Sequence, residues 1–183
     1  MNYTDKVVIV TGGTKGIGKG CVQTFASAGA KVVFCARHAS EGDELARRVN
    51  EHGPGEALFM TCDVSKPDQI ESLVNEAVAR YGQLDCLVNN AGWHPPHQPI
   101  DDFTPQDFLD LLQLNVISVF AGCKYALPHL RKTKGNIINL SSLVGVMGQL
   151  YASTYVATKG AITSLTKARA VQEDAVECRG RGE

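Results

Sequence analysis

Short β-branched runs alternate along the chain with longer stretches in which apolar residues recur at helical spacing. The first run, KVVIVTGG (6–13), is continuously apolar until its glycines, which is typical of a strand buried on both faces of a parallel sheet. Behind it, Ile17, Val22 and Phe25 share one helical face, and Gly29 stands where that helix would end. Further strands are predicted in KVVFCAR (31–37), ALFMTCDV (57–64), LDCLVNNAG (84–92) and GNIINLSS (135–142).

Charged and amphipathic stretches between these runs predict the remaining helices. The predicted ranges are 41–52, 67–81, about 104 to 132, and from about 153 towards the end of the chain. Pro67 suits the first position of a helix, and Gly82 lies just beyond the end of the same stretch. Thr104, with Asp107 three residues on, predicts a cap for the long helix. The proline-rich segment 93–103 is expected to be a loop.

Five alternations of strand and helix, joined by short connections, predict an α/β fold. The expected architecture is a Rossmann-like, doubly wound parallel sheet with helices on both faces, truncated after the fifth strand and the helix that follows it. Residues 1–183 are expected to form one dinucleotide-binding domain, with 172–183 as an atypical polar tail. In such sheets, ligands bind outside the carboxyl ends of the strands.

Composition narrows the possible partners. The chain has 18 Lys and Arg against 19 Asp and Glu, so its net charge of −1 provides no field that would attract nucleic acid or anionic lipid. Its six cysteines form no C-x-x-C pair and are expected to be buried thiols in a reducing compartment. No run approaches the roughly 18 apolar residues that a membrane span needs. We therefore expect a cytoplasmic protein with a small-molecule substrate and no membrane or nucleic-acid partner.

The turn TGGTKGIG (11–18) lies between the first strand and the first helix. Gly12, Gly16 and Gly18 would let the backbone approach a pyrophosphate, whose charge the helix N-terminus stabilises. A close helix crossing can need the same residues, and the spacing G-x-x-x-G-x-G differs from the G-x-G-x-x-G fingerprint. The context of strand, turn and helix favours a nucleotide site.

The end of the second strand bears on which nucleotide is bound. An acid there binds the ribose hydroxyls of NAD, whereas an arginine accommodates the 2′-phosphate of NADP. Ala36 stands where the acid is expected and Arg37 follows, so NADP is favoured over NAD, unless Arg37 is only a solvated strand end. Asp63 and Val64 end the third predicted strand, where an adenine could bind. The fourth strand ends in Asn90, Ala91 and Gly92. Either segment could instead be an ordinary turn without a ligand.

Tyr155 and Lys159 are four residues apart, so they would be neighbours on one helix face. A nearby ammonium stabilises a phenolate and brings a phenol closer to use as a general acid or base at working pH. Ser142, at the end of the fifth strand, could hold a substrate oxygen near that phenol. A Tyr and Lys pair at this spacing is common by chance, but the serine strengthens the catalytic interpretation.

Together, T-G-x-x-x-G-I-G (11–18), N-N-A-G (89–92), Asn115, Ser142 and Y-x-x-x-K (155–159) resemble the short-chain dehydrogenases/reductases over residues 6–170. The resemblance implies an NAD(P)-dependent oxidoreductase that transfers hydride between a nicotinamide and a secondary alcohol or ketone. The stretches NNAGWHPPHQ, YALPHLRK, NIINLSSLVG and YVATKGAIT are more similar still to its 17-beta-hydroxysteroid dehydrogenase branch. They imply a steroid-like substrate or a sugar.

The resemblance also implies roles for individual residues. Tyr155 would exchange the proton, Lys159 would assist it and bind the nicotinamide ribose, Ser142 would orient the substrate oxygen, and Asn115 would hold a water in the proton relay. His94 and Gln149 would line the substrate pocket with Ser142. The residues expected to touch the dinucleotide are Gly12, Lys15, Gly16, Ile17, Gly18, Arg37, Asp63, Val64, Asn90, Ala91, Gly92, Tyr155 and Lys159.

Two alternatives accompany this assignment. His94 and His97 invite a metal interpretation, but no further ligand stands at recognisable spacing, so no metal site is predicted. The chain also departs from the family, because KARAVQEDAVECRGRGE replaces an expected sixth strand and substrate loop. The alternative function is therefore a catalytically silent isoform that binds nucleotide weakly or pairs with a full-length partner. Related enzymes form oligomers through the helices near 104–132 and 153–171.

Overall fold

The computed structural model describes residues 2–179, so residues 180–183 of the predicted polar tail lie outside it. Its strands are β1 (Val7–Thr11), β2 (Lys31–Ala36), β3 (Glu56–Thr61), β4 (Cys86–Asn89) and β5 (Asn136–Asn139). Its helices are α1 (Gly16–Ser27), α2 (Ala39–His52), α3 (Pro67–Tyr81), α4 (Pro105–Leu112), α5 (Ser118–Thr133) and α6 (Ser153–Arg179). A π-helical turn (Gln113–Ile117) joins α4 to α5, and short 3-10 helices cover Ile100–Asp102 and Leu143–Gly145.

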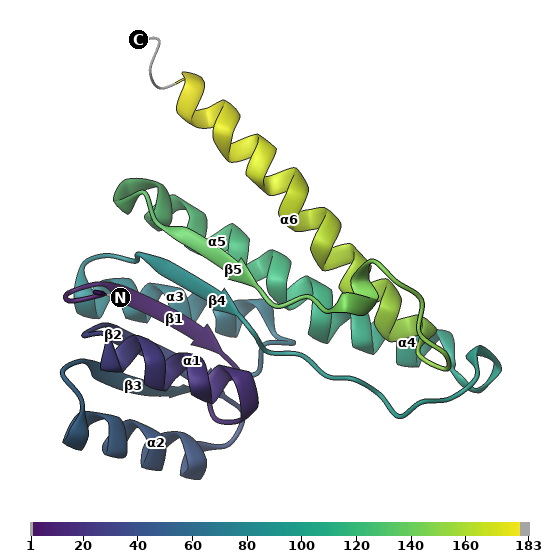
Figure 1. Ribbon diagram of the computed structural model, residues 1–183, viewed down its shortest axis with the longest axis horizontal. Coiled ribbons are helices and arrows are strands. Elements are labelled where there is room, and N and C mark those ends of the chain that lie inside the picture. The colour runs from purple at the N-terminus through teal and green to yellow at the C-terminus, as the bar shows by residue number, and fades with distance from the viewer. Residues whose placement is uncertain (1, 180–183) are drawn as a thin grey trace.

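The five strands form one parallel sheet in the order β3-β2-β1-β4-β5, as the alternation of strands and helices predicts. The chain winds outward from β1 to β3 on one side and then returns to β4 and β5 on the other (Figure 1). The winding direction therefore reverses between β1 and β4. The carboxyl ends of these two strands flank the crevice in which an open α/β sheet binds its ligand.

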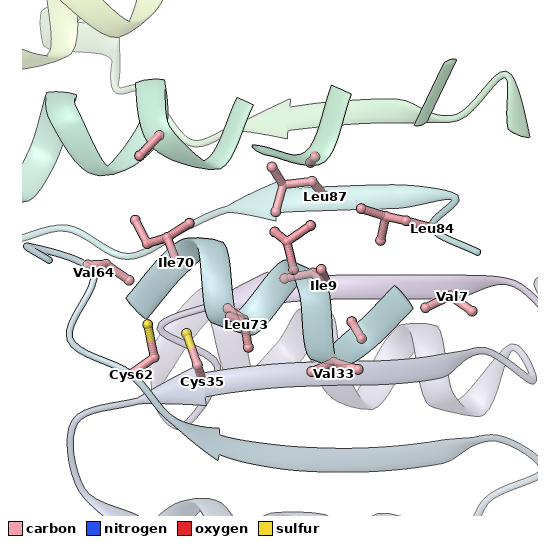
Figure 2. Packing of buried hydrophobic residues seen from close by; sticks show 14 of the residues in the cluster. Val7, Ile9, Val33, Cys35, Cys62, Val64, Ile70, Leu73, Leu84 and Leu87 are labelled. Atoms are coloured by element: carbon pink, nitrogen blue, oxygen red, sulfur yellow. The ribbon is translucent and has the colours of Figure 1, made fainter. Parts of the chain in front are cut away.

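Side chains alternate between two cores, one on each face of the sheet. From β1, Val8 and Val10 pack with α1 and α2, whereas Val7 and Ile9 pack with α3 and α5. Figure 2 shows the second core, where Ile70 and other α3 side chains meet the sheet. All residues of β1 are buried, which explains their continuous apolar pattern.

The predicted helix signals are confirmed at three ends. Pro67 begins α3, and Gly82 ends it in the left-handed conformation with φ of 78°. Thr104 and Asp107 form a reciprocal capping box at the start of α4. Pro67 and Thr104 thereby fix where the segments that follow β3 and β4 become helical.

One predicted helix differs from expectation. The stretch 104–132 was predicted as a single regular helix, but the π-helical turn at Gln113–Ile117 interrupts it. The combined segment Pro105–Thr133 is long and apolar enough to cross a membrane by length and composition, yet half of its most apolar window is buried. This burial, against α3 and β4, is typical of a helix in a protein core.

Candidate active site

The glycine turn after β1 is shaped by backbone packing. Gly12 and Gly16 have φ of +65° and +52°, a region that side chains rarely adopt. A Cβ atom on Gly18 would lie 2.2 Å from the Gly12 carbonyl oxygen and 2.4 Å from Asn90 Nδ2. Gly18 therefore allows α1 to approach the turn, which is the packing role that the sequence left open beside the nucleotide role.

Asn90 holds this turn from the neighbouring strand. Its Nδ2 donates to the carbonyl oxygens of Thr11 and Gly12 at 2.8 and 3.0 Å. The Thr11 hydroxyl in turn accepts from the backbone N–H groups of Asn90 and Ala91. The ends of β1 and β4 are thus tied together at the crevice, and Asn90 acts on the turn as well as facing the cavity.

A cavity of about 640 Å³ opens beside this turn. It takes residues from the carboxyl ends of β1, β2, β3 and β4 and from the first turn of α1. Helix α1 has no side-chain cap on its first N–H groups, which leaves them available to an anion. The lining residues are Gly12, Thr14, Lys15, Gly16, Ile17, Ala36, Arg37, His38, Glu41, Cys62, Asp63, Val64, Asn90, Ala91, Gly92, Trp93 and Leu114.

The structure therefore brings ten of the residues predicted to touch a dinucleotide around one cavity, while Gly18 lies behind it. Sequence reasoning missed His38 and Glu41, which enter the cavity at the start of α2. Glu41 pairs with Lys15 at 3.1 Å between Oε1 and Nζ. No local signal distinguishes this glutamate from the other charges of α2, because its partner comes from a different loop.

Asp63 follows β3 and is held in a turn. Partial burial raises its pKa, but hydrogen bonds from Ser65 and the nearby charges of Arg37 and Lys66 outweigh that effect and leave the pKa below its usual value. The carboxylate is therefore ionised at neutral pH. An anionic Asp63 and a cationic Arg37 face the same cavity, which gives this end of it two opposite charges.

Tyr155 and Lys159 meet on the first turns of α6, as their spacing predicts. The Lys159 side chain is buried, its Nζ donates to the Leu140 carbonyl oxygen at 2.7 Å, and it lies 5.7 Å from the centroid of the Tyr155 ring. Burial lowers the pKa of Lys159. A Cβ on Gly92 would lie 3.8 Å from the same Nζ, so α6 meets the end of the cavity there.

Asn115 is fully buried in the π-helical turn. Its Oδ1 accepts from the Trp93 N–H, and its Nδ2 donates to the Trp93 carbonyl oxygen, both at 2.9 Å. Nδ2 also lies 3.2 Å from the Thr158 hydroxyl, next to Lys159. The side chain thus fastens the loop after β4 to α6.

Ser142 begins the 3-10 helix after β5, and its hydroxyl accepts from the Val144 N–H at 3.4 Å. This short helix packs on α6 at the level of the lysine, since a Cβ on Gly145 would lie 2.9 Å from the Lys159 carbonyl oxygen. Among the hydrogen bonds of residues 2–179, none joins Ser142 to Tyr155. Ser142 thus stands at the start of a segment that packs on α6, and its role towards a substrate stays a prediction.

Two loops meet at the phenol. The His94 ring lies 4.1 Å from the Tyr155 ring and 5.0 Å from the His97 ring, measured between centroids. Gln149 Nε2 lies within hydrogen-bonding distance of His97 Nε2 at 3.1 Å, and the Gln98 N–H donates to the Tyr151 carbonyl oxygen. The loops after β4 and β5 are therefore linked beside Tyr155. In the described part of the chain, no three His, Cys, Asp or Glu side chains gather as metal ligands.

A crevice at the switch point, an uncapped helix beside a glycine turn, and a tyrosine beside a buried lysine lie at one edge of the sheet, an arrangement that is typical of nucleotide-dependent oxidoreductases. The short-chain dehydrogenase family model matches residues 6–178, and the chain belongs to that family.

Its relatives carry different substrate names. The chain is 50% identical over 171 residues to the L-fucose dehydrogenase of Bos taurus, covering 93% of this chain and 62% of the relative. It is 36% identical to the 3beta-hydroxysteroid dehydrogenase of Mediterraneibacter gnavus, over 92% of this chain and 61% of the relative. The chain thus spans about three fifths of the length of these relatives. Neither is named as a 17-beta-hydroxysteroid dehydrogenase, so that finer expectation is not confirmed.

Solved structures share the fold. Levodione reductase superposes with a TM-score of 0.89 at 31% identity, covering 93% of this chain and 67% of that one. An alcohol dehydrogenase from Thermococcus sibiricus, complexed with 5-hydroxy-NADP, gives 0.88 at 25% identity, with 91% and 71% covered. The parallel α/β architecture predicted from the sequence is therefore confirmed.

Proposed function

We propose that the chain binds NAD(P) in the cavity beside the glycine turn and serves oxidation and reduction between a secondary alcohol and a ketone. The observation that best supports this proposal is that the buried Lys159 ammonium lies beside the Tyr155 ring. Both are at the edge of the sheet where this cavity opens. The open N-terminus of α1 suits a pyrophosphate, and no heavy atom lies within 4 Å of the position that a Cβ on Gly16 would take, so the backbone is accessible there. When bound, the nicotinamide would supply or accept the hydride.

The proton is assigned to the phenol of Tyr155. The carbonyl of Leu140 orients the ammonium of Lys159 by accepting one of its hydrogen bonds, and this positive charge would stabilise negative charge that develops on the phenol oxygen as the proton moves. Asn115 keeps the Trp93 loop against α6, so the cavity wall and the phenol stay in fixed relation. Ser142 is proposed to hold the substrate oxygen.

NADP is the proposed cofactor, because Ala36 leaves the ribose side without a strand-end acid and Arg37 lines the same cavity. The proposed substrate is a steroid-like alcohol or a sugar. Relatives named for L-fucose and for a 3beta-hydroxysteroid support both classes. His94 and Gln149 are proposed to line its pocket, since both lie in the linked loops beside Tyr155.

Nucleotide binding is tested by fluorescence titration of the purified chain with NADPH and NADH. Gly18→Ala should weaken binding at least tenfold, because the added Cβ would collide with the Gly12 carbonyl oxygen. Gly20→Ala is the matched control on the same helix, because its Cβ meets nothing within 4 Å. Arg37→Ala should weaken NADPH binding while leaving NADH binding unchanged. Equal binding by both glycine variants would refute this site.

Catalysis is tested by following NADPH or NADH absorbance with L-fucose and hydroxysteroid substrates. Tyr155→Phe removes the proposed proton donor and should lower turnover by a factor of 10² or more. Tyr151→Phe is the control, since that exposed tyrosine lies four residues earlier, in the turn before α6. Nucleotide binding should be the same in both variants. Turnover retained by Tyr155→Phe would remove the phenol from the mechanism.

A second candidate is a nucleotide-binding subunit that completes its catalytic edge with another chain. Large apolar side chains between β5 and α6 are exposed, namely Leu143, Val146, Met147 and Leu150. This candidate predicts nucleotide binding without turnover by the isolated chain, and turnover on mixing with a longer relative. Light scattering on the mixture would measure the association directly.

A further inference from the structure

Two cysteines lie against each other at one end of the cavity. Cys35 is in β2, and Cys62 follows β3, where its N–H donates to the Ala36 carbonyl oxygen at 3.0 Å. Figure 2 shows their sulfur atoms side by side, and each thiol influences the pKa of the other. Both residues are buried, with 0% and 2% of their surface exposed. The sequence indicated only that the cysteines would be buried thiols.

The two thiols are chemically different. The neighbouring Cys35 thiol lowers the pKa of Cys62, whereas the Cys62 thiol and burial raise the pKa of Cys35 well above its usual value. Burial raises the pKa of Cys21, Cys86 and Cys123. Only the thiolate is a good nucleophile, so Cys62 has the most favourable environment for reaction among these cysteines.

Their access also differs. Cys62 is part of the cavity wall, beside Asp63 and Val64, whereas Cys35 is not. A small oxidant entering the cavity therefore meets Cys62 first, with Cys35 behind it as a ready second thiol. A thiolate with an adjacent resolving thiol is the arrangement of a reversible redox cysteine.

We propose that Cys35 and Cys62 form an oxidisable dithiol that closes to a disulfide in the presence of a hydroperoxide. The Cys62 sulfur attacks a peroxide oxygen, the O–O bond breaks, and with hydrogen peroxide a sulfenic acid and one water result. The Cys35 sulfur then attacks the Cys62 sulfur, forming the S–S bond and breaking the S–O bond. The Cys35 proton leaves with the hydroxyl as a second water, so two thiols and one peroxide give one disulfide and two waters.

The disulfide would change the cavity. Cys35 pairs with Met60 across the two strands, so Cys62 is two positions out of register with it. On regular strands that offset separates the Cα atoms by roughly 8 Å, beyond the about 4.4–6.8 Å that a disulfide spans. Closing the bond must therefore displace the segment Cys62–Val64, which lines the cavity. We expect the disulfide to weaken nucleotide binding. This effect on binding rests on the proposed function, whereas the formation of the disulfide does not.

The test is a hydrogen peroxide titration of the full, reduced chain, followed by peptide mapping without reductant. The expected product is a Cys35–Cys62 cross-linked peptide, two hydrogen masses lighter than the two free peptides. Cys35→Ala should instead give a Cys62 sulfenic acid that dimedone traps. Cys123→Ala is the matched control, because it removes a buried cysteine from another cluster and should still form the bridge.

Nucleotide titration of the same samples measures the consequence. The bridged chain should bind NADPH or NADH at least tenfold more weakly than the reduced chain, and dithiothreitol should restore binding. Saturating nucleotide should slow formation of the bridge by covering Cys62, a measurement on the unmodified sequence that does not depend on any variant folding.

The results that would contradict the dithiol, its effect on the cavity and the proposed function can be told apart. Oxidation of Cys62 without a bridge to Cys35, or a bridge in which another cysteine replaces either, would overturn the dithiol. A confirmed bridge with unchanged nucleotide affinity would overturn its effect on the cavity. Absence of nucleotide binding by the reduced chain would count against the proposed function, while the peptide map would still decide whether the dithiol exists.

Discussion

Strands β1 and β5 belong to the same sheet but differ greatly in burial. Every residue of β1 is buried between two neighbouring strands and two layers of helices. In β5, which pairs only with β4 in the described chain, no residue is fully buried, and Ile138 is 43% exposed. The glycine turn thus follows a fully buried strand, while α6, which carries the proposed catalytic tyrosine, follows the least buried strand.

The same difference applies to α6. It packs chiefly against the 3-10 helix at Leu143–Gly145, the π-helical turn and α4, and its main apolar contact is the small cluster around Ile162. Figure 1 shows α6 on the β5 side of the sheet, apart from α1 and α2. Nucleotide binding and catalysis should therefore have separate stability requirements, with the tyrosine site lost first.

The largest expected effect is on the free energy of unfolding, when the same Ile→Ala substitution is made in β1 and in β5. Ile9→Ala in β1 should lower the free energy of unfolding by about 2–5 kcal/mol, because a fully buried side chain leaves a cavity. Ile138→Ala in β5 should cost less than about 1 kcal/mol, because that side chain is already partly solvated. Urea unfolding measures both, and equal losses would contradict the comparison.

A smaller loss of stability is expected where Asn115 joins the loop after β4 to α6. Asn115→Ala should lower the free energy of unfolding by about 1–3 kcal/mol, because it leaves polar groups of the Trp93 backbone without partners. Asn75→Ala, on the exposed side of α3, is the control and should be nearly neutral. Proteolysis should cut Asn115→Ala faster near Trp93. An unchanged cleavage pattern would show that Asn115 does not hold that loop.

The smallest effect lies at the far side of α6. Arg131 on α5 binds both carboxylate oxygens of Glu173 at 2.8 and 3.0 Å, and these bonds lower the pKa of Glu173. Glu173→Gln should cost below about 1 kcal/mol, because the pair is partly exposed.

The pH dependence of this last effect has a definite sign. A depressed folded-state pKa stabilises the protein above the unfolded value of about 4.3, and that contribution is lost as the pH falls through the folded value. The stability difference between the original chain and Glu173→Gln should therefore shrink in acid. A difference that grows in acid would exclude this ion pair as its source.

The sequence was sufficient for the strands and for most of the cavity wall. Continuous β-branched runs identify β1 and β2 because burial on both faces leaves no polar position, and glycines mark the turn because few other residues adopt its angles. Parallel strands bring their carboxyl ends to one edge, so residues far apart in sequence could be grouped without knowing any contact.

Contacts between distant loops could not be predicted in the same way. Asn115 binds Trp93 and Thr158, which lie 22 and 43 residues away, and no local pattern marks such partners. The pairing of Lys15 with Glu41 and that of Cys35 with Cys62 have the same origin. The sequence supplies the chemical groups, but only the folded register brings them within reach.

The π-helical turn also keeps three side chains in line. In a regular α-helix, each step of four residues drifts by about 40° around the axis, so two such steps would rotate Val119 well away from Leu111. The wider turn absorbs this drift, and Leu111, Asn115 and Val119 are all buried. The extra residue of the π-helical turn therefore keeps these three side chains on one side of the helix. From there they contact both the loop after β4 and the core beneath α6.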